Sequence, residues 1–116
     1  MIDLSFTDID LIVHPADRYV AAHQGAEQVA LAVIAAVGGP VRGRPDVWDL
    51  LTDRAPEMAE WAAFFGYLAP RVAVVAAGEI GIVGEREADD LARDLRNFTA
   101  QAGQKMHRMA LRRNVS

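Results

Sequence analysis

The stretch that decides the fold is HPADRYVAAHQGAEQVALAVIAAVGG, residues 14–39. Pro15 suits the first position of a helix, because a backbone N–H is not needed there. The apolar and small residues that follow recur at helical spacing, so one stripe faces a core. The members of that stripe are Tyr19, Ala22, His23, Ala26, Val29, Ala30, Val33 and Val37. Gly38 and Gly39 end the pattern, which predicts one long helix over Pro15–Val37.

Three further helices are predicted downstream of a linker at residues 38–46, GGPVRGRPD. Asp46 is placed to cap a short helix over Val47–Arg54. Pro56 restarts the chain, and Met58, Trp61, Ala62, Phe65, Leu68 and Ala69 form one face of a helix over Pro56–Leu68. The last helix is expected from Glu85 to Arg112, weakened midway by Gly103.

Two segments remain ambiguous. Residues 71–77 are β-branched enough for a strand, but we favour a helix that continues past a kink at Pro70. In residues 2–13 the apolar positions alternate as in a strand in the first half and recur at helical spacing in the second half. Because Thr7 followed by Asp10 resembles a helix cap, we expect a short helix over Asp8–Val13.

These elements predict an all-α fold, an up-and-down helical bundle with about three long and two short helices. A chain of 116 residues fits one domain. We expect that domain to span residues 1–116, with an N-terminal extension at 1–13 and a basic C-terminal tail at 105–116. Among the aromatic residues of the 61–67 segment, one or two are expected at the surface, because they cannot all face one stripe.

The amino-acid composition excludes several kinds of catalytic site. The chain has no Cys, and Ser occurs only at positions 5 and 116, which leaves no thiol nucleophile and no serine motif. His14, His23 and His107 have no metal-binding spacing, and GGPVRGRP lacks the ending of a phosphate loop. We therefore expect no metal and no cofactor. The N-terminus has neither the bases nor the apolar run of a signal peptide, so we expect a cytoplasmic protein that does not enter a membrane.

The net charge of the chain is −4, and the charged residues are unevenly distributed along it. Residues 93–116 contain six bases and one acid, so they carry +5, and the rest of the chain carries −9. Such a basic tail is able to contact RNA or an acidic protein partner, and Arg108 and Arg112 share one face of its helix. Bases near a helix C-terminus also complement the helix dipole, and we favour this second interpretation.

Four ordered blocks resemble a known family: RYVAAHQGAEQVALAVIAA, GRPDVWDLLTD, APEMAEWAAFF and EREADDLARDLRNF. Together they are similar to a small actinobacterial group of HEPN-type helical domains, over roughly residues 16–99. The resemblance implies a bundle of four to five helices that often dimerises. Several HEPN proteins are metal-independent ribonucleases, which use an Arg and a His four to six residues later, with the pair from each protomer lining a shared cleft.

This sequence departs from the family's catalytic pattern. The pair normally lies late in the bundle, where Arg96 and Asn97 match its start, but the His position falls on Gln101, Ala102 or Gly103. Arg18 and His23 have the required spacing, although they open the first long helix instead. In such a pair His transfers protons and Arg holds the phosphate. Without a catalytic role, we expect His23 at the core edge, bonded to a neighbouring helix, and Arg18 as an exposed base paired with Asp17 or another acid.

Two functions follow. The one we favour is a non-catalytic interaction module, or a nucleotide- or RNA-associated one, for which Arg96, Asn97, Arg108 and Arg112 are the candidate binding residues. The alternative is a metal-independent ribonuclease acting through Arg18 and His23. A ribonuclease needs both side chains in one solvent-reached cleft. In either case we expect a homodimer, because the alanine-rich stripe, the surplus aromatics and the resemblance all favour association.

Overall fold

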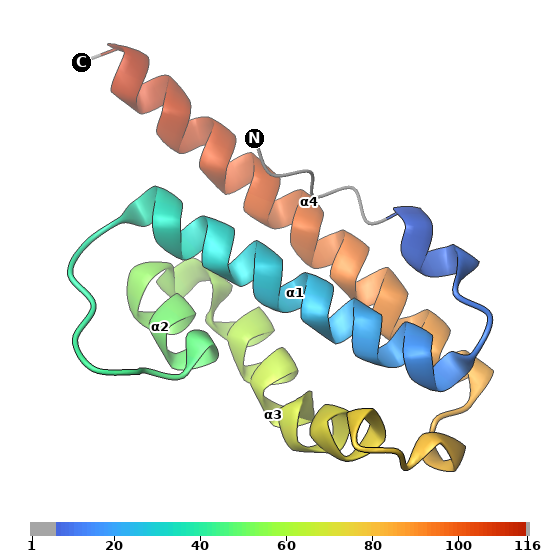
Figure 1. Ribbon diagram of the computed structural model, residues 1–116. Helices are drawn as coiled ribbons and strands as arrows, with labels where there is room; N and C mark the ends of the chain where they lie inside the picture. Colours follow the sequence, from blue (N-terminus) through green and yellow to red (C-terminus); the bar gives the residue numbers. More distant parts are fainter. Residues whose placement is uncertain (1–6, 116) are drawn as a thin grey trace.

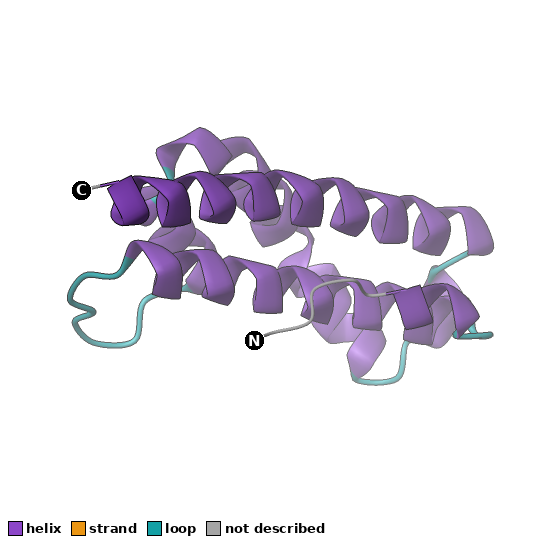
Figure 2. Ribbon diagram, turned by 90° about the horizontal axis from the view of Figure 1, so that it is seen from above, coloured by secondary structure: helices purple, strands orange, loops and turns teal. Residues whose placement is uncertain are grey.

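Every regular element in the computed structural model, which describes residues 7–115, is a helix (Figures 1 and 2). The expected all-α fold is therefore confirmed. Its elements are the 3-10 helix η1 (Thr7–Leu11), α1 (Pro15–Val37), α2 (Val47–Arg54), the 3-10 helix η2 (Pro56–Met58), α3 (Ala59–Ala76), the 3-10 helix η3 (Ile80–Ile82) and α4 (Glu85–Val115).

The long helices run up, down and up. Helices α1 and α4 lie side by side and point the same way, while α3 runs back between them in sequence and in the opposite direction (Figure 1). The last turns of α4 project beyond the end of α1, at the left of the view (Figure 1). Helix α1 is in contact with each of the other three, so it is the centre of the bundle.

The core is built on the predicted stripe of α1. Tyr19, Ala22, Ala26, Val29 and Val33 are all buried, because α4, α3 and α2 cover this face of α1. The alanines have no side chain beyond Cβ, which allows the neighbouring helices to approach closely.

An aromatic cluster fills the space between α1, α2, α3 and α4. The ring of Phe65 lies 5.3 Å from Trp48, 5.8 Å from Trp61 and 5.2 Å from Phe98, centroid to centroid. On the same helix Phe64 is 37% exposed and Tyr67 83% exposed. The expectation that one or two aromatic residues of this segment face solvent is confirmed.

Helix α3 continues through Pro70 to Ala76, so residues 71–76 are helical and not a strand, as we expected. Pro70 has no N–H to donate to the carbonyl of Gly66, four residues earlier, which weakens the helix at this point. The axis of α3 changes direction in its second half (Figure 1). This bend carries the chain toward η3 and the start of α4.

The boundaries differ from expectation at the two ends. The expected helix over Asp8–Val13 is wrong in type and length: residues Thr7–Leu11 form a 3-10 helix, residues 12 and 13 are not helical, and His14 is extended before Pro15. The rest of the ambiguous segment, residues 2–6, lies outside the described residues. Helix α4 runs three residues past Arg112, to Val115. Asp46 caps α2 as expected, accepting hydrogen bonds from the backbone N–H groups of Trp48 and Asp49.

By length and composition alone, α1 is able to cross a membrane, and 44% of its most apolar window is buried inside this fold. One such helix is weak evidence, because the core helix of a globular protein has the same composition.

Candidate functional site

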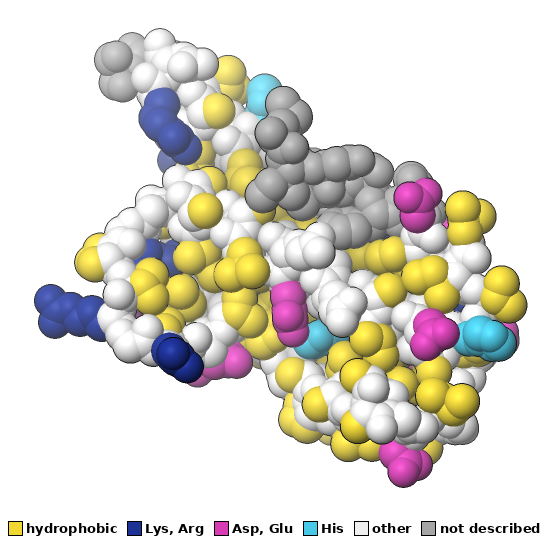
Figure 3. Space-filling view, viewed as in Figure 1, with side chains coloured by type: hydrophobic (Ala, Val, Ile, Leu, Met, Phe, Trp, Pro, Cys, Tyr) yellow, Lys and Arg dark blue, Asp and Glu magenta, His cyan; other side chains and the backbone are white. Residues whose placement is uncertain are grey.

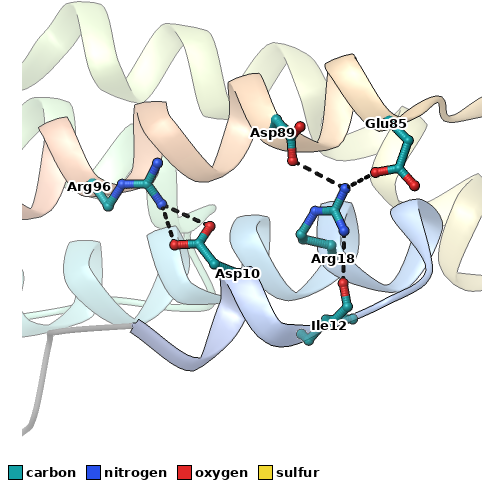
Figure 4. A network of polar contacts seen from close by, with 6 residues as sticks. All are labelled: Asp10, Ile12, Arg18, Glu85, Asp89 and Arg96. Atoms are coloured by element: carbon teal, nitrogen blue, oxygen red, sulfur yellow. Dashed lines mark hydrogen bonds and ion pairs between the residues drawn. The ribbon is translucent and has the colours of Figure 1, made fainter.

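Arg18 lies on the first turn of α1 and its guanidinium is held between η1 and α4 (Figure 4). One terminal nitrogen donates to the carbonyl of Ile12 at 2.7 Å. The other donates to Glu85 at 2.5 Å and pairs with Asp89 at 3.1 Å. The hydrogen bond to Glu85, with the added charge of Asp89, raises the pKa of Arg18, so the side chain remains a cation.

The expectation that Arg18 pairs with Asp17 or another acid is confirmed, with Glu85 and Asp89 as the acids, but the expectation that it is exposed is wrong. Its side chain is only 7% exposed, whereas those of Glu85 and Asp89 are 68% and 66% exposed. The reason lies in the parallel packing of α1 and α4, which places the first turns of both helices together. Carboxylates are favourable at the start of α4 because of the helix dipole, and they supply the charge that lets Arg18 be buried.

His23 lies about one turn and a half further along α1 and faces α2 and α3. Its Nε2 donates to the backbone carbonyl of Phe65 in α3 at 2.9 Å. Because a carbonyl only accepts, this nitrogen carries a hydrogen. The ring also packs edge-on against Trp48, and Nδ1 lies 3.5 Å from a carboxylate oxygen of Glu27. His23 is 2% exposed, which is the placement expected of a histidine at the core.

The two residues therefore do not open into one cleft. Arg18 is directed toward η1 and α4, and His23 toward α2 and α3. This follows from their spacing, because five residues correspond to about 140° around a helix. Within this chain each is engaged in contacts that join neighbouring helices.

The residues that match the start of the family's catalytic motif lie on α4. One terminal nitrogen of Arg96 donates to both carboxylate oxygens of Asp10 in η1, each at 3.0 Å (Figure 4). Asn97, next to it, is exposed. The Arg96 guanidinium thus joins η1 to α4, although its side chain is still 48% exposed.

The basic tail forms the last turns of α4. Arg108 and Arg112 are exposed, and neither makes a hydrogen bond or an ion pair with any residue between 7 and 115. Lys105 differs, because it forms an ion pair with Glu57, and this hydrogen bond lowers the pKa of the Glu57 carboxyl. On the face drawn in Figure 3, the visible Lys and Arg side chains gather at the end of the bundle where α4 and the 38–46 linker lie.

Two adjoining hollows lie between α3 and α4, and the sequence did not predict them. The larger, of about 620 Å³, has Phe64, Leu68 and Leu91 among its lining residues. The smaller, of about 350 Å³, is lined by Glu57, Glu60, Trp61, Phe64, Asp94 and Gln101. Both include Phe64 and Asp94, so they form one groove with an aromatic floor, which we call the α3–α4 groove. The groove is acidic on balance, because two bases, Arg86 and Arg93, stand against five carboxylates in its lining: Glu57, Glu60, Glu87, Asp90 and Asp94. The only sequence signal for it was the surplus of aromatic residues on the α3 helix.

Tyr19 closes the inner end of the larger hollow. Its hydroxyl is buried and has no hydrogen-bond partner among the described residues. Burial, together with the charge of Glu87, raises the pKa of Tyr19. Arg71 opposes this shift of the Tyr19 pKa, as a nearby cation and donor. Its guanidinium donates to Glu87 and to the carbonyl of Ile82, and it makes no direct hydrogen bond to the Tyr19 hydroxyl.

Replacing Tyr19 with Phe is expected to increase the free energy of unfolding by about 1 kcal/mol at pH 7, because an unpaired buried hydroxyl is removed. The raised pKa adds a second expectation. A group whose pKa is raised in the folded state stabilises the fold below its unfolded pKa, about 10 for Tyr, and this stabilisation is lost as the pH rises further. Wild type should therefore lose stability above pH 10 through Tyr19, whereas Tyr19→Phe should not. Urea unfolding at pH 7 and above pH 10 measures both effects.

The matched control is Tyr67→Phe on exposed α3 surface, for which we expect no change at either pH. A loss of stability in Tyr19→Phe would contradict the prediction, since it would mean that the hydroxyl is hydrogen-bonded.

A family model described as HEPN_SAV_6107-like HEPN matches residues 10–102 of this chain. The matched range includes α1, α2, α3 and α4 as far as Ala102, and it ends before the basic tail. Among curated proteins and among solved structures, the comparison finds no significant match.

Proposed function

Because this chain belongs to the HEPN_SAV_6107-like HEPN family, we propose that it is a non-catalytic HEPN module that acts by binding a partner. The match confirms the resemblance drawn from residues 16–99 and accounts for the helical bundle. It is silent on catalysis, so the argument for the role rests on the side chains of this chain.

The observation that carries the proposal is that Arg18 and His23 are both used inside the fold. A metal-independent ribonuclease needs a histidine that exchanges protons with the 2′-hydroxyl, and a cation that binds the phosphate. Here the Nε2 hydrogen of His23 is given to the Phe65 carbonyl. The charge of Arg18 is neutralised by Glu85 and Asp89. Neither side chain is left with a free donor directed at solvent.

Charge favours a protein partner over RNA. Asp10 forms an ion pair with Arg96. Among the candidate binding residues, Asn97, Arg108 and Arg112 are therefore the ones exposed without an ion pair to any residue between 7 and 115. A polyanion that contacted these bases along α4 would also meet Asp90 and Asp94, whose repulsion opposes RNA binding. An acidic groove beside exposed aromatic rings suits a cationic, partly apolar surface instead.

The direct test is cleavage of labelled single-stranded RNA in the presence of a chelator. We expect wild-type protein to leave the RNA intact. The variant His23→Gln and the control His107→Gln, at an exposed histidine, are expected to behave alike. Cleavage by wild type that is lost in folded His23→Gln but kept in His107→Gln would overturn the proposal in favour of the ribonuclease.

Fluorescence anisotropy with a labelled RNA distinguishes a protein-binding module from an RNA-associated one. We expect no salt-sensitive complex, and no effect of the double variant Arg108→Glu/Arg112→Glu on RNA affinity. The reversal should cost only about 0.3–1 kcal/mol of stability for each residue, through the helix dipole. A complex that weakens steeply with salt and is lost on reversal would identify an RNA-associated module.

A further inference from the structure

One stripe of α4 changes the sign of its charge along its length. At 100° per residue, positions seven apart lie almost in line, so Glu87, Asp94, Gln101 and Arg108 share a face. Positions 90, 97, 105 and 112 fall within about 40° of the same line. The α4 stripe is thus Glu87, Asp90, Asp94, Asn97, Gln101, Lys105, Arg108 and Arg112. Its first part is acidic, its middle neutral and its last part basic.

The stripe is complementary to itself when it is reversed about Gln101. Asp94 and Arg108 are each seven residues from Gln101, and Asp90 and Arg112 are each eleven residues from it. A second α4 laid antiparallel, with the two Gln101 residues facing each other, therefore places Asp94 opposite Arg108 and Asp90 opposite Arg112. A two-fold axis makes each of these contacts twice, as a self-complementary dimer interface requires.

We propose that a second copy of this chain binds along the α4 stripe, antiparallel and centred on Gln101. The inference deepens the proposed function, on which it rests, by naming the partner. Homodimerisation was expected from sequence, and the stripe specifies which surface makes the dimer and in which register.

The charges that would pair between copies are available. Arg108 and Arg112 are exposed and have no ion pair among the described residues. Among the described residues, Asp90 and Asp94 form ion pairs with Arg93 alone, at 3.2 and 3.5 Å, and their side chains are 47% and 22% exposed. The partner Arg93 is 57% exposed, so these pairs have little net strength. In contrast, Glu87 and Lys105 at the edges of the stripe are already engaged, by Arg71 and Glu57.

Apolar area for the contact comes from the α3–α4 groove, which runs beside the stripe. Phe64 is partly exposed there, and the floor continues through Trp61 and Leu68. The projecting end of α4 carries Met109 and Leu111 beside its bases. A second α4 lying over the groove would cover this surface, adding hydrophobic burial to the charge pairs.

Sedimentation velocity at increasing protein concentration tests the assembly. We expect a dimer at low salt that weakens as salt is raised from about 50 mM to about 500 mM, because its charge pairs are near the surface. Arg108→Glu alone and Asp94→Lys alone should each raise the dissociation constant more than about tenfold, since like charges then face each other. Arg42→Glu, at an exposed linker base, is the matched control and should dimerise like wild type.

The combined variant Asp94→Lys/Arg108→Glu should restore the dimer, because the pairs are remade with their signs exchanged. Circular dichroism establishes that each variant keeps its helices. Failure of the combined variant to dimerise, while both single variants are folded, would overturn the proposed register.

Disulfide crosslinking locates the two-fold axis. The chain has no Cys, so Gln101→Cys introduces a single thiol that meets its own copy if the axis passes there. We expect efficient oxidation to a covalent dimer for Gln101→Cys and little for Ala100→Cys, one residue away but about 100° around the helix and exposed.

Equal crosslinking of the two variants, or a wild-type monomer at concentrations up to about 100 μM, would overturn the inference. Either result leaves the non-catalytic role standing, because that role is tested by RNA cleavage. Conversely, RNA cleavage through His23 would defeat the proposed function without changing the sedimentation result.

Discussion

Replacing Phe65 with Ala is expected to lower the free energy of unfolding by about 3–5 kcal/mol, the largest effect of any single change considered for this protein. Phe65 is fully buried and its ring contacts the rings of Trp48, Trp61 and Phe98. These rings come from α2, α3 and α4, so the cavity left by the truncation would loosen three helices at once. Urea unfolding followed by far-UV circular dichroism measures the loss.

The control is Tyr67→Ala, two positions along the same helix and 83% exposed, which should change stability by less than about 0.5 kcal/mol. A loss of 3–5 kcal/mol is a large share of the stability of a small domain, so Phe65→Ala itself is at risk of not folding. Phe65→Leu keeps most of the volume and should cost about 1–2 kcal/mol. An unchanged midpoint for Phe65→Leu and Phe65→Ala alike would contradict the central place of this ring.

Replacing Arg18 with Ala is expected to cost about 2 kcal/mol of stability, because two hydrogen bonds, the ion pair with Asp89 and the packing of a buried side chain are lost. The expected loss of stability is smaller than for breaking a fully buried ion pair, because Glu85 and Asp89 are exposed and remain hydrated when Arg18 is removed. Denaturant midpoints of purified variants give the measurement.

Two comparisons separate the causes. Arg18→Met retains the aliphatic packing and should recover part of the loss. Arg93→Ala removes an exposed arginine that also contacts two carboxylates, and should cost less than about 0.5 kcal/mol. If Arg18→Ala were as mild as Arg93→Ala, the guanidinium would not hold α1 to α4. Arg18 would then be free to serve another role, including catalysis.

The sequence by itself determined both ends of α1 and the start of α2. Pro15, the glycines at 38 and 39 and the cap at Asp46 act on the backbone within a few residues, so local chemistry is enough to place these boundaries. The spacing of Tyr19, Ala22, Ala26 and Val29 likewise identified the buried face of α1 before any neighbour was known. The family, too, was recognisable from ordered motifs along the chain.

Only the tertiary structure decided how the polar residues are used. The burial of Arg18 was missed because Glu85, which accepts its hydrogen bond, lies 67 residues away in the chain. Asp10 is likewise 86 residues from Arg96. The α3–α4 groove likewise depends on how two helices are spaced, and the buried Tyr19 hydroxyl on what surrounds it. The sequence specifies the charge of a side chain, but its ion-pair partner and its hydration depend on which helix ends lie together in the folded protein.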